Sequence, residues 1–315
     1  MLTLFDDQVR KLLNTRDVIA TIERAFARDY DSSVHMPRRM QMETPGGVLL
    51  IMPCYDSALP AMGIKLVFVR EGAAAGETRV QASYALFDPV SGSLLALLEA
   101  NYLTEVRTAA TSAVATKYLA RRDSTTLGIF GTGRQALAHL AVFAEVFAFH
   151  RALICGSSPA RSEEFVRTAA AGTLTLEAAD APTLVAQSDV ICTCTTSSEP
   201  LFDGRWLRPG THLNLVGAFR PARREVDDET IRRGRVVVDT YDGALAEAGD
   251  LLIPMQSGAV THDHIVADLH ELVSGKKPAR RATDEITLFK SVGCALEDLV
   301  TADLVYHRAL HTAGS

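Results

Sequence analysis

Hydrophobic and polar positions follow two different periods along the N-terminal third of the chain. Residues 1–30 carry apolar side chains at helical spacing, which predicts two helices, the second capped by Thr15. From Gly46 to Glu99 the apolar residues form short runs separated by turns, the pattern of strands. The expected strands are Val48–Met52, Ile64–Val69, Val80–Phe87 and Leu94–Leu98, with Asp88–Gly92 as a hairpin loop. This part is therefore predicted to be α+β, with an antiparallel sheet.

The middle of the chain alternates between apolar runs and helical segments. The expected strands are residues 127–131, 151–156, 189–195, 211–217 and 235–239. This alternation predicts an α/β domain with a Rossmann-type, doubly wound parallel sheet. An alanine-rich helix, capped by Thr104, is expected before it from about Thr104 to Arg122, and a final helical segment from Asp284 to about His307.

Composition and charge exclude several classes of protein. The chain has 315 residues, 47% of them hydrophobic and 22% charged, which suits a globular protein of two domains or one large one. Its net charge of -6 argues against nonspecific binding of nucleic acid. No apolar run reaches the roughly 18 residues of a membrane span, and Asp6 and Asp7 stand where a signal peptide is basic. The five cysteines show no disulfide framework, so a cytoplasmic location is expected.

The most informative local motif is the segment Leu127–Ala136, in which an apolar run ends in Gly131-x-Gly133-x-x-Ala136. Gly131 permits a tight turn, Gly133 lets the backbone approach a pyrophosphate, and Ala136 lets the following helix pack on the strand. The N–H groups at the helix start then hold the phosphates. The alternative is a glycine-rich turn that binds no ligand. A second apolar strand, Arg151–Cys155, follows at about the expected spacing of roughly 20 residues and favours dinucleotide binding.

The end of this second strand bears on the choice between NAD and NADP. An NAD enzyme usually has an acidic residue there, which binds the ribose hydroxyls. This chain instead has Ser157 and Ser158, followed by Arg161, so NADP is favoured over NAD. Arg161 could equally be a surface residue of a helix. Thr195 and Thr196 follow another predicted strand, at the sheet edge where ligands bind in this fold, and are expected to contact the ribose or amide.

Several phrases along the whole chain together resemble the ornithine cyclodeaminase/mu-crystallin family. They are Met36–Arg39, Gly63–Lys65, Arg107–Ala113, the glycine turn, Val216–Pro221, Gly249–Ile253 and Glu285–Gly293. The resemblance implies a discontinuous substrate-binding and dimerisation domain, residues 1–122 and 292–315, around an NAD(P)-binding domain, residues 123–291. It also implies a homodimer and a small amino-acid or cyclic imino-acid substrate.

Two arginines are candidates for binding the carboxylate of such a substrate, since a guanidinium group offers two parallel charge-assisted hydrogen bonds. Arg107 lies among alanines and small hydroxyl residues, near the start of a predicted helix. From the residues alone, a solvent-facing helix arginine is an equal alternative. The resemblance assigns Arg107 to the substrate, with Arg39 as a second carboxylate ligand; Arg39 could also be a charged loop residue.

Lys65 is unusual because it interrupts the apolar strand Ile64–Val69. An outward lysine on an edge strand is one interpretation. The other is a partly desolvated proton donor or acceptor, and the resemblance implies that Lys65 is the catalytic lysine. Gln81 is a further substrate-contact candidate by resemblance, although a solvated polar residue on a strand is the alternative.

Phe219 departs from the pattern of ornithine cyclodeaminases, which carry an aspartate there. Phenylalanine cannot exchange a proton, and the surrounding phrase resembles the ketimine-reductase and pyrroline-2-carboxylate-reductase branch. The sequence is therefore interpreted as an NAD(P)H-dependent reductase of Δ1-pyrroline-2-carboxylate or Δ1-piperideine-2-carboxylate. Asp227 or Asp228 could replace the missing acid, but both are expected to begin the next helix.

Three alternatives to a reductase remain open. They are an ornithine cyclodeaminase, an alanine dehydrogenase-like enzyme and a noncatalytic NADP-binding protein. The motif and the resemblance together give the expected cofactor-binding residues: Gly131, Thr132, Gly133, Arg134, Gln135, Ser157, Ser158, Arg161, Thr195, Thr196, Gly217, Phe219, Lys290 and Ser291. No metal site is expected, since His262 and His264 have no third ligand in the sequence.

Overall fold

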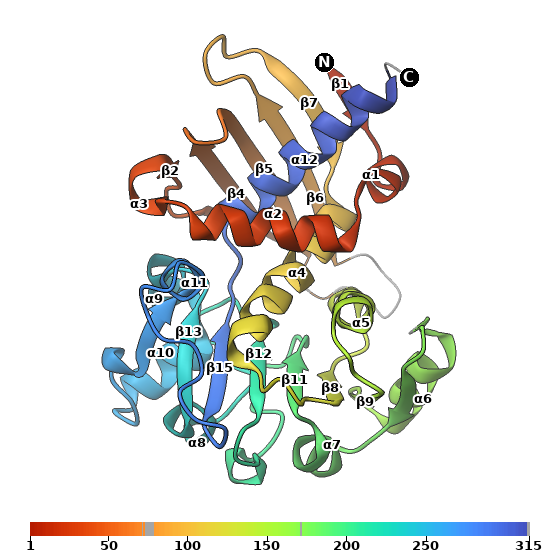
Figure 1. The fold of residues 1–315 in the computed structure, drawn as a ribbon, viewed down its shortest axis with the longest axis vertical. Coiled ribbons are helices and arrows are strands. Elements are labelled where there is room, and N and C mark those ends of the chain that lie inside the picture. Colours follow the sequence, from red (N-terminus) through yellow and green to blue (C-terminus); the bar gives the residue numbers. More distant parts are fainter. Residues whose placement is uncertain (71, 73–78, 171, 314–315) are drawn as a thin grey trace. The chain divides into compact units, whose positions relative to one another are not determined.

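The computed structural model describes residues 1–70, 72, 79–170 and 172–313 (Figure 1). The chain divides into two compact units. The first contains residues Met1–Thr111 and Cys294–Ser315, and the second contains Ser112–Gly293. The resemblance implied boundaries after residues 122 and 291. The first boundary in the structure falls earlier, inside an α-helix, and the second falls slightly later.

The first unit is built on a mixed sheet with the strand order β1-β7-β6-β5-β4-β2, and β3 also pairs with β4. Its strands are β1 (Leu2–Leu4), β2 (Val34–His35), β3 (Met40–Thr44), β4 (Gly47–Asp56), β5 (Ala61–Arg70), β6 (Val80–Phe87) and β7 (Leu94–Glu99). The predicted antiparallel arrangement of the four long strands β4 to β7 is confirmed. β1 adds a parallel edge, which the short Leu2–Leu4 run did not predict.

Helices cover one face of this sheet. The helices of the unit are α1 (Asp6–Leu12), α2 (Thr15–Ala27), α3 (Tyr30–Ser33) and α12 (Ala295–Ala313). Val18, Ile22, Ala25 and Phe26 of α2 are buried, and α12 packs on both α2 and the strands β4 and β5 (Figure 1). The cap of α2 is Asn14, whose side chain accepts from the N–H groups of Arg16 and Asp17, rather than Thr15.

Helix α4 (Asn101–Leu119) begins one turn earlier than predicted. Thr104 is therefore not its cap. The Thr104 hydroxyl donates to the carbonyl oxygen of Ala100, a bond typical of a threonine inside a helix. The division between the two units lies within this helix.

The second unit contains the predicted Rossmann-type sheet, in which every neighbouring pair of strands is parallel. The strand order is β10-β9-β8-β11-β12-β15-β13-β14. These strands are β8 (Thr126–Phe130), β9 (Arg151–Cys155), β10 (Thr175–Ala178), β11 (Val190–Thr193), β12 (His212–Leu215), β13 (Gly234–Val238), β14 (Ile265–Asp268) and β15 (Ile286–Lys290). The chain leaves β8 toward β9 on one side and later returns to β11 on the other. The carboxyl ends of β8 and β11 therefore form the switch point at which ligands bind in such sheets.

Helices connect these strands. They are α5 (Arg134–Val146), α6 (Pro159–Thr168), α7 (Ala181–Gln187), α8 (Asp228–Arg233), α9 (Tyr241–Glu247), α10 (Gly249–Gln256) and α11 (Leu269–Val273), with the short 3-10 turns η1 (Gly204–Trp206) and η2 (His262–His264). Within the described residues, no helix is long and apolar enough to cross a membrane.

The prediction of one helical segment from Asp284 to His307 is wrong. Residues Ile286–Lys290 form the buried strand β15, which pairs with β12 and β13, and α12 begins only at Ala295. Gly293 ends the strand segment with a positive φ of 79°. A strand that is buried on both faces has no alternation of polar and apolar residues, so it cannot be distinguished from a buried helix by periodicity.

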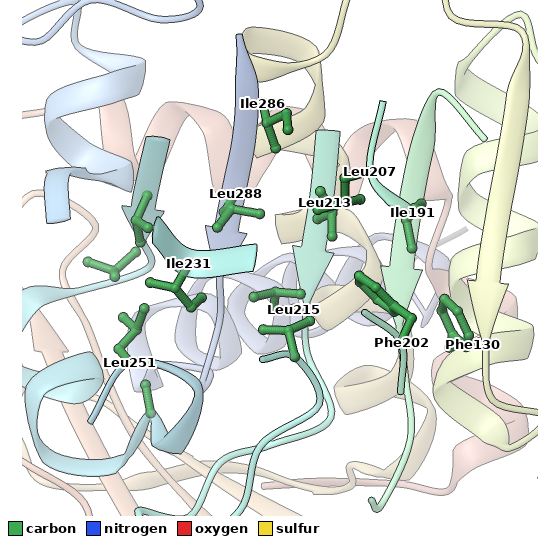
Figure 2. Packing of buried hydrophobic residues seen from close by; sticks show 14 of the residues in the cluster. Phe130, Ile191, Phe202, Leu207, Leu213, Leu215, Ile231, Leu251, Ile286 and Leu288 are labelled. Carbon is green, nitrogen blue, oxygen red and sulfur yellow. The ribbon is translucent and has the colours of Figure 1, made fainter. Parts of the chain in front are cut away.

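One apolar cluster of the second unit lies along one side of its sheet. Figure 2 shows Ile191, Leu213 and Leu288 of three adjacent strands together with side chains from the connecting segments. The rings of Phe130 and Phe202 stack with 5.4 Å between their centroids. This packing fixes the carboxyl ends of β8, β11 and β12, from which the candidate ligand-binding loops extend.

Candidate active site

Lys65 is buried in the middle of the first unit. It lies on β5, which is an interior strand between β4 and β6, so the edge-strand interpretation is wrong. Its side chain is 1% exposed, and α12 covers it. The Lys65 Nζ lies 2.6 Å from both carboxylate oxygens of Asp298 on α12 and donates a hydrogen bond to Oδ1. A fully buried lysine with a carboxylate partner is an ionisable group inside the protein rather than a surface charge.

Arg107 joins the same cluster from α4. Its Nη1 donates to Glu297 Oε2 at 2.5 Å, and its Nε lies 2.8 Å from Asp298 Oδ1. Arg107 is also buried, with 5% of its surface exposed, so the interpretation as a solvent-facing arginine is wrong. Two cations and two carboxylates thus lie together inside the first unit, and their formal charges cancel. Neutralisation of this kind is what allows four charged groups to be buried.

The surroundings of Lys65 bring its pKa closer to neutral pH. Burial and the positive charge of Arg107 together lower the pKa of Lys65 to about 8, although Asp298 and Glu297 oppose the shift. Burial raises the pKa of the nearby Cys54 thiol to about 12 and the pKa of the Tyr84 hydroxyl well above its usual value. Lys65 is therefore the member of this group that is able to exchange a proton near pH 8.

Tyr84 lies beside Lys65 in the sheet, since the two residues are paired across β5 and β6. A Cβ on Gly63 would lie 2.3 Å from the Tyr84 oxygen, so only glycine permits this close packing. The Tyr84 hydroxyl is buried and has no hydrogen-bond partner among the described residues. It is therefore a polar atom within the cluster that a bound ligand is able to satisfy.

The other two predicted substrate ligands are placed differently. Arg39 is half-buried and lies directly before β3. Gln81 is exposed on β6, three residues from Tyr84. Because side chains alternate along a strand, Gln81 is on the opposite face of the sheet from Lys65 and Tyr84. The structure therefore brings Lys65 and Arg107 together and separates Gln81 from them.

Glu297 and Asp298 were not identified from the sequence. They stand in the apolar run of α12, between Leu296 and Leu299, and both are completely buried. An acidic pair at buried helix positions was the available signal, but its partners are far away in the sequence: Lys65 and Asp298 are 233 residues apart.

In the second unit, the glycine turn has the geometry that the sequence predicted. Gly131 follows β8 with a φ of 110°, and a Cβ at this position would lie 2.5 Å from the carbonyl oxygen of Cys194. Gly133 precedes α5, and a Cβ built on it meets no atom within 4 Å. Ala136 is completely buried. Open space at Gly133, beside the N-terminus of a helix of 13 residues, fits the approach of a pyrophosphate.

The end of β9 carries hydroxyl groups rather than an acid. The Ser158 side chain caps α6 by accepting from the N–H of Arg161 at 3.4 Å. Ser157 and Arg161 are exposed, and Gly156 donates its N–H to the Ser162 hydroxyl. Glycine and serine therefore follow the strand directly, where an NAD enzyme usually has a carboxylate.

A buried carboxylate holds the two loops that follow β11 and β12. Glu225 accepts hydrogen bonds at 2.7 Å from the hydroxyls of Thr193 and Thr195 and from the N–H groups of Thr195 and Gly217. A Cβ on Gly217 would lie 2.1 Å from the Thr195 carbonyl oxygen, so the loops approach too closely for any other residue. Thr196, in contrast, is exposed. Glu225 was not identified from the sequence, where it is one acid in a charged run.

Lys290 and Ser291, at the carboxyl end of β15, contact the residues that support these loops. The Lys290 Nζ donates to the carbonyl oxygens of Ala218 at 2.5 Å and Leu215 at 3.2 Å, and it is completely buried. The Ser291 hydroxyl donates to Asp239 at 3.2 Å. In this structure both residues therefore have partners within the protein, which indicates a positioning role.

Phe219 is half-buried and packs against the apolar core of the second unit. Asp227 and Asp228 have the helix-terminal role expected of them. Asp227 caps α8 by accepting from the N–H and hydroxyl of Thr230, and Asp228 is paired with Arg224. His262 and His264 lie in η2, and no group of three or more metal-ligand side chains occurs among the described residues.

Comparison with known proteins identifies the family of this chain. The sequence model of the ornithine cyclodeaminase/mu-crystallin family matches residues 2–313. The ketimine reductase mu-crystallin of Mus musculus is 41% identical over 286 residues, which are 89% of this chain and 87% of that protein. The Δ1-pyrroline-2-carboxylate reductase of Thermococcus litoralis, solved with NADH and L-proline, is 39% identical with a TM-score of 0.96, over 99% of this chain and 98% of that one. An archaeal alanine dehydrogenase dimer with bound NAD is 29% identical with a TM-score of 0.92, over 99% and 97% of the two chains.

Proposed function

Since this chain belongs to the ornithine cyclodeaminase/mu-crystallin family, we propose that it is an NAD(P)H-dependent reductase of a small cyclic imino acid, such as Δ1-pyrroline-2-carboxylate or Δ1-piperideine-2-carboxylate. The observation that carries this proposal is the buried Lys65, whose pKa near 8 suits a proton donor at neutral pH. The reductases named among its relatives supply the substrate class.

Reduction of a cyclic imine adds two electrons and a proton to carbon and one proton to nitrogen. The nicotinamide cofactor supplies the hydride for the carbon. Lys65 gives the proton for the nitrogen from its ammonium group. Arg107 binds the substrate carboxylate through its guanidinium group, which requires that the carboxylate compete with or join Glu297 and Asp298.

The glycine turn would hold the cofactor pyrophosphate at the N-terminus of α5, through the backbone around Gly131 and Gly133. Ser157 and Arg161 would interact with a 2′-phosphate, so we expect NADPH to be preferred over NADH. The loops fixed by Glu225 carry Thr195, Gly217 and Phe219 to the carboxyl ends of β11 and β12. At that edge of the sheet they would contact the nicotinamide half.

Phe219 distinguishes reduction from cyclodeamination. Release of ammonia from ornithine requires a group that exchanges a proton with the leaving amine, and a phenylalanine ring has none. Asp227 and Asp228 are already engaged at the start of α8. We therefore expect imine reduction without conversion of ornithine to proline.

The direct experiment combines purified protein with NADPH or NADH and the two cyclic imines, and separately with L-ornithine and NAD. We expect cofactor oxidation with an imine and no ammonia from ornithine. Release of proline and ammonia from ornithine at rates comparable with imine reduction would contradict the proposal. The Lys65→Ala variant should lose turnover but still bind NADPH, which separates its proton transfer from any effect on the nucleotide domain.

We further propose that the first unit forms a homodimer through the face of its sheet that lies opposite Lys65. Strand alternation and register place Ile51, Ile64, Leu66, Ala85 and Leu97 on this face, and all are half-buried or exposed. Leu66 is 41% and Leu97 is 39% exposed. A contiguous apolar face of this kind favours a protein partner, and the dimer of the related alanine dehydrogenase favours a second copy of this chain.

Sedimentation velocity tests the homodimer. The Leu66→Asp/Leu97→Asp variant should sediment as a monomer, while Val90→Asp should not change the assembly, because Val90 is 94% exposed outside this face. A wild-type protein that is monomeric at micromolar concentration would contradict the proposal.

Five cysteines without a disulfide support a cytoplasmic location.

A further inference from the structure

A single carboxylate of the first unit contacts both of its buried cations. Asp298 lies within 2.6 Å of the Lys65 Nζ and has its Oδ1 2.8 Å from the Arg107 Nε. Glu297, the adjacent acid on α12, contacts the Arg107 Nη1. Both neighbouring acids therefore contact Arg107, and Asp298 also contacts Lys65.

We propose that Asp298 is a positioning residue that holds the Lys65 ammonium group in place and in its charged form, ready to protonate the substrate nitrogen. This inference rests on the proposed reductase function and adds a residue to it. Asp298 does not contact substrate in this role. It acts through Lys65, because its carboxylate lies 2.6 Å from the ammonium group and accepts a hydrogen bond through Oδ1, which leaves ammonium protons for donation.

The charge balance around Lys65 explains why this partner is necessary. Burial and the positive charge of Arg107 both lower the pKa of Lys65, whereas the charge and hydrogen bond of Asp298 raise it. If Asp298 were neutral, only the weaker effect of Glu297 would oppose the two effects that lower the pKa of Lys65. Lys65 would then be mostly uncharged at neutral pH and would have no proton to give.

The other groups around Lys65 do not replace Asp298. The titratable or charged groups of the surrounding elements include Cys54 and Asp56 on β4, Tyr84 on β6, Arg107 on α4, and Glu297, Asp298 and Asp303 on α12. Burial raises the pKa values of Cys54 and Tyr84, so both stay neutral when Lys65 titrates. Glu297 is engaged with Arg107 and also accepts from the Cys294 thiol.

The proton step is balanced within this cluster. An N–H bond of the Lys65 ammonium breaks, and a new N–H bond forms at the imine nitrogen. Lys65 becomes neutral, and Asp298 keeps one cationic partner, Arg107. Water then returns a proton to Lys65, and Asp298 again stabilises the charged form.

The test compares Asp298→Asn, Asp298→Glu and Glu297→Gln through the pH dependence of kcat/KM for imine reduction. Since reduction requires protonated Lys65, wild-type activity should fall above about pH 8. Asp298→Asn should move this alkaline limb to lower pH by about one unit or more. Asp298→Glu keeps the charge and should restore the limb, with a lower kcat from altered geometry. Glu297→Gln should mainly change KM, because its acid contacts Arg107.

A second measurement does not depend on turnover. In protein labelled with 15N at lysine Nζ, the Lys65 resonance, identified by its loss in Lys65→Arg, should titrate at lower pH in Asp298→Asn than in the wild type. If the wild type reduces no imine but this shift occurs, the proposed function fails while the role of Asp298 holds. If pH profile and titration are both unchanged in Asp298→Asn, the inference is wrong. If Asp298→Asn does not fold, Asp298→Glu provides the test. If the alkaline limb of Asp298→Glu lies about one pH unit or more below that of the wild type, although the charge is kept, the inference is wrong.

Discussion

The ammonium group of Lys290 and the carboxylate of Asp250 form a fully buried ion pair, with 2.9 Å between Nζ and Oδ2. Lys290 ends β15 and Asp250 lies in the first turn of α10. The lysine also donates to the carbonyl oxygens of Leu215 and Ala218, and Asp250 accepts from the N–H of Glu225 at 2.6 Å. The pair therefore holds both ends of the loop that contains Phe219.

Substitution of Lys290 tests this structural role. Lys290→Met leaves the Asp250 charge without its buried counter-ion, so the free energy of unfolding should fall by about 3–5 kcal/mol. Urea unfolding followed by circular dichroism measures this change. The double variant Lys290→Met/Asp250→Asn removes the unpaired charge and should recover part of the loss. Equal stabilities of Lys290→Met and the wild type would show that the pair contributes little.

Arg107→Lys should weaken the capture of substrate specifically. It retains the positive charge next to Glu297 and Asp298 but loses the planar pair of donors, so kcat/KM for a cyclic imine should fall roughly 10- to 100-fold. The dissociation constant for NADPH, measured by fluorescence titration, should stay the same. A similar loss of NADPH affinity would instead indicate that Arg107 supports the fold.

Cofactor preference should depend on the residues after β9. Ser157→Asp places a carboxylate where a 2′-phosphate is expected, so the ratio of NADPH to NADH affinity should fall through charge repulsion. Arg161→Ala should weaken NADPH and leave NADH nearly unaffected. Calorimetric titration with both cofactors provides the measurement. A clear preference of the wild type for NADH would exclude this interpretation of the loop.

Two buried histidines of the second unit should make stability depend on pH. Burial lowers the pKa of His139 to about 4 and the pKa of His212 to about 3. In the unfolded chain each histidine has a pKa near 6.5, so the unfolded state binds more protons between these values. The free energy of unfolding should therefore fall as pH decreases from about 6.5 to 4, by several kcal/mol in total.

Chemical unfolding at a series of pH values measures this dependence. His139→Gln retains a polar side chain but removes the titration, so its stability curve should be flatter between pH 6.5 and 4. The His139 Nδ1 lies 2.8 Å from the Gln135 carbonyl oxygen, and its Nε2 lies 2.9 Å from the Ser112 hydroxyl. A neutral imidazole ring is able to form both hydrogen bonds. A slope identical to that of the wild type would exclude His139 as a source.

The strand periodicity of the first unit and the glycine turn of the second, each encoded within a short stretch of residues, were predicted correctly from the sequence. The strands β4 to β7 alternate with a period of two, because one face of their sheet is covered by helices and the other is not. The glycine turn after β8 was equally readable, since its backbone conformation and close contacts require glycine at particular positions. The resemblance, which the family match confirms, drew on such phrases along the whole chain.

Features that depend on distant residues required the tertiary structure. β15 carries no readable period because both of its faces are buried, and its pairing with β12 and β13 supplies the hydrogen bonds that make it a strand. The partner of Lys65 could not be predicted either, because Asp298 is 233 residues away and has the pattern of an ordinary acid in an amphipathic helix. Residue types and local spacing thus specify which chemistry is available. Only folding, which buries opposite charges from separate elements against each other, specifies which carboxylate controls which lysine.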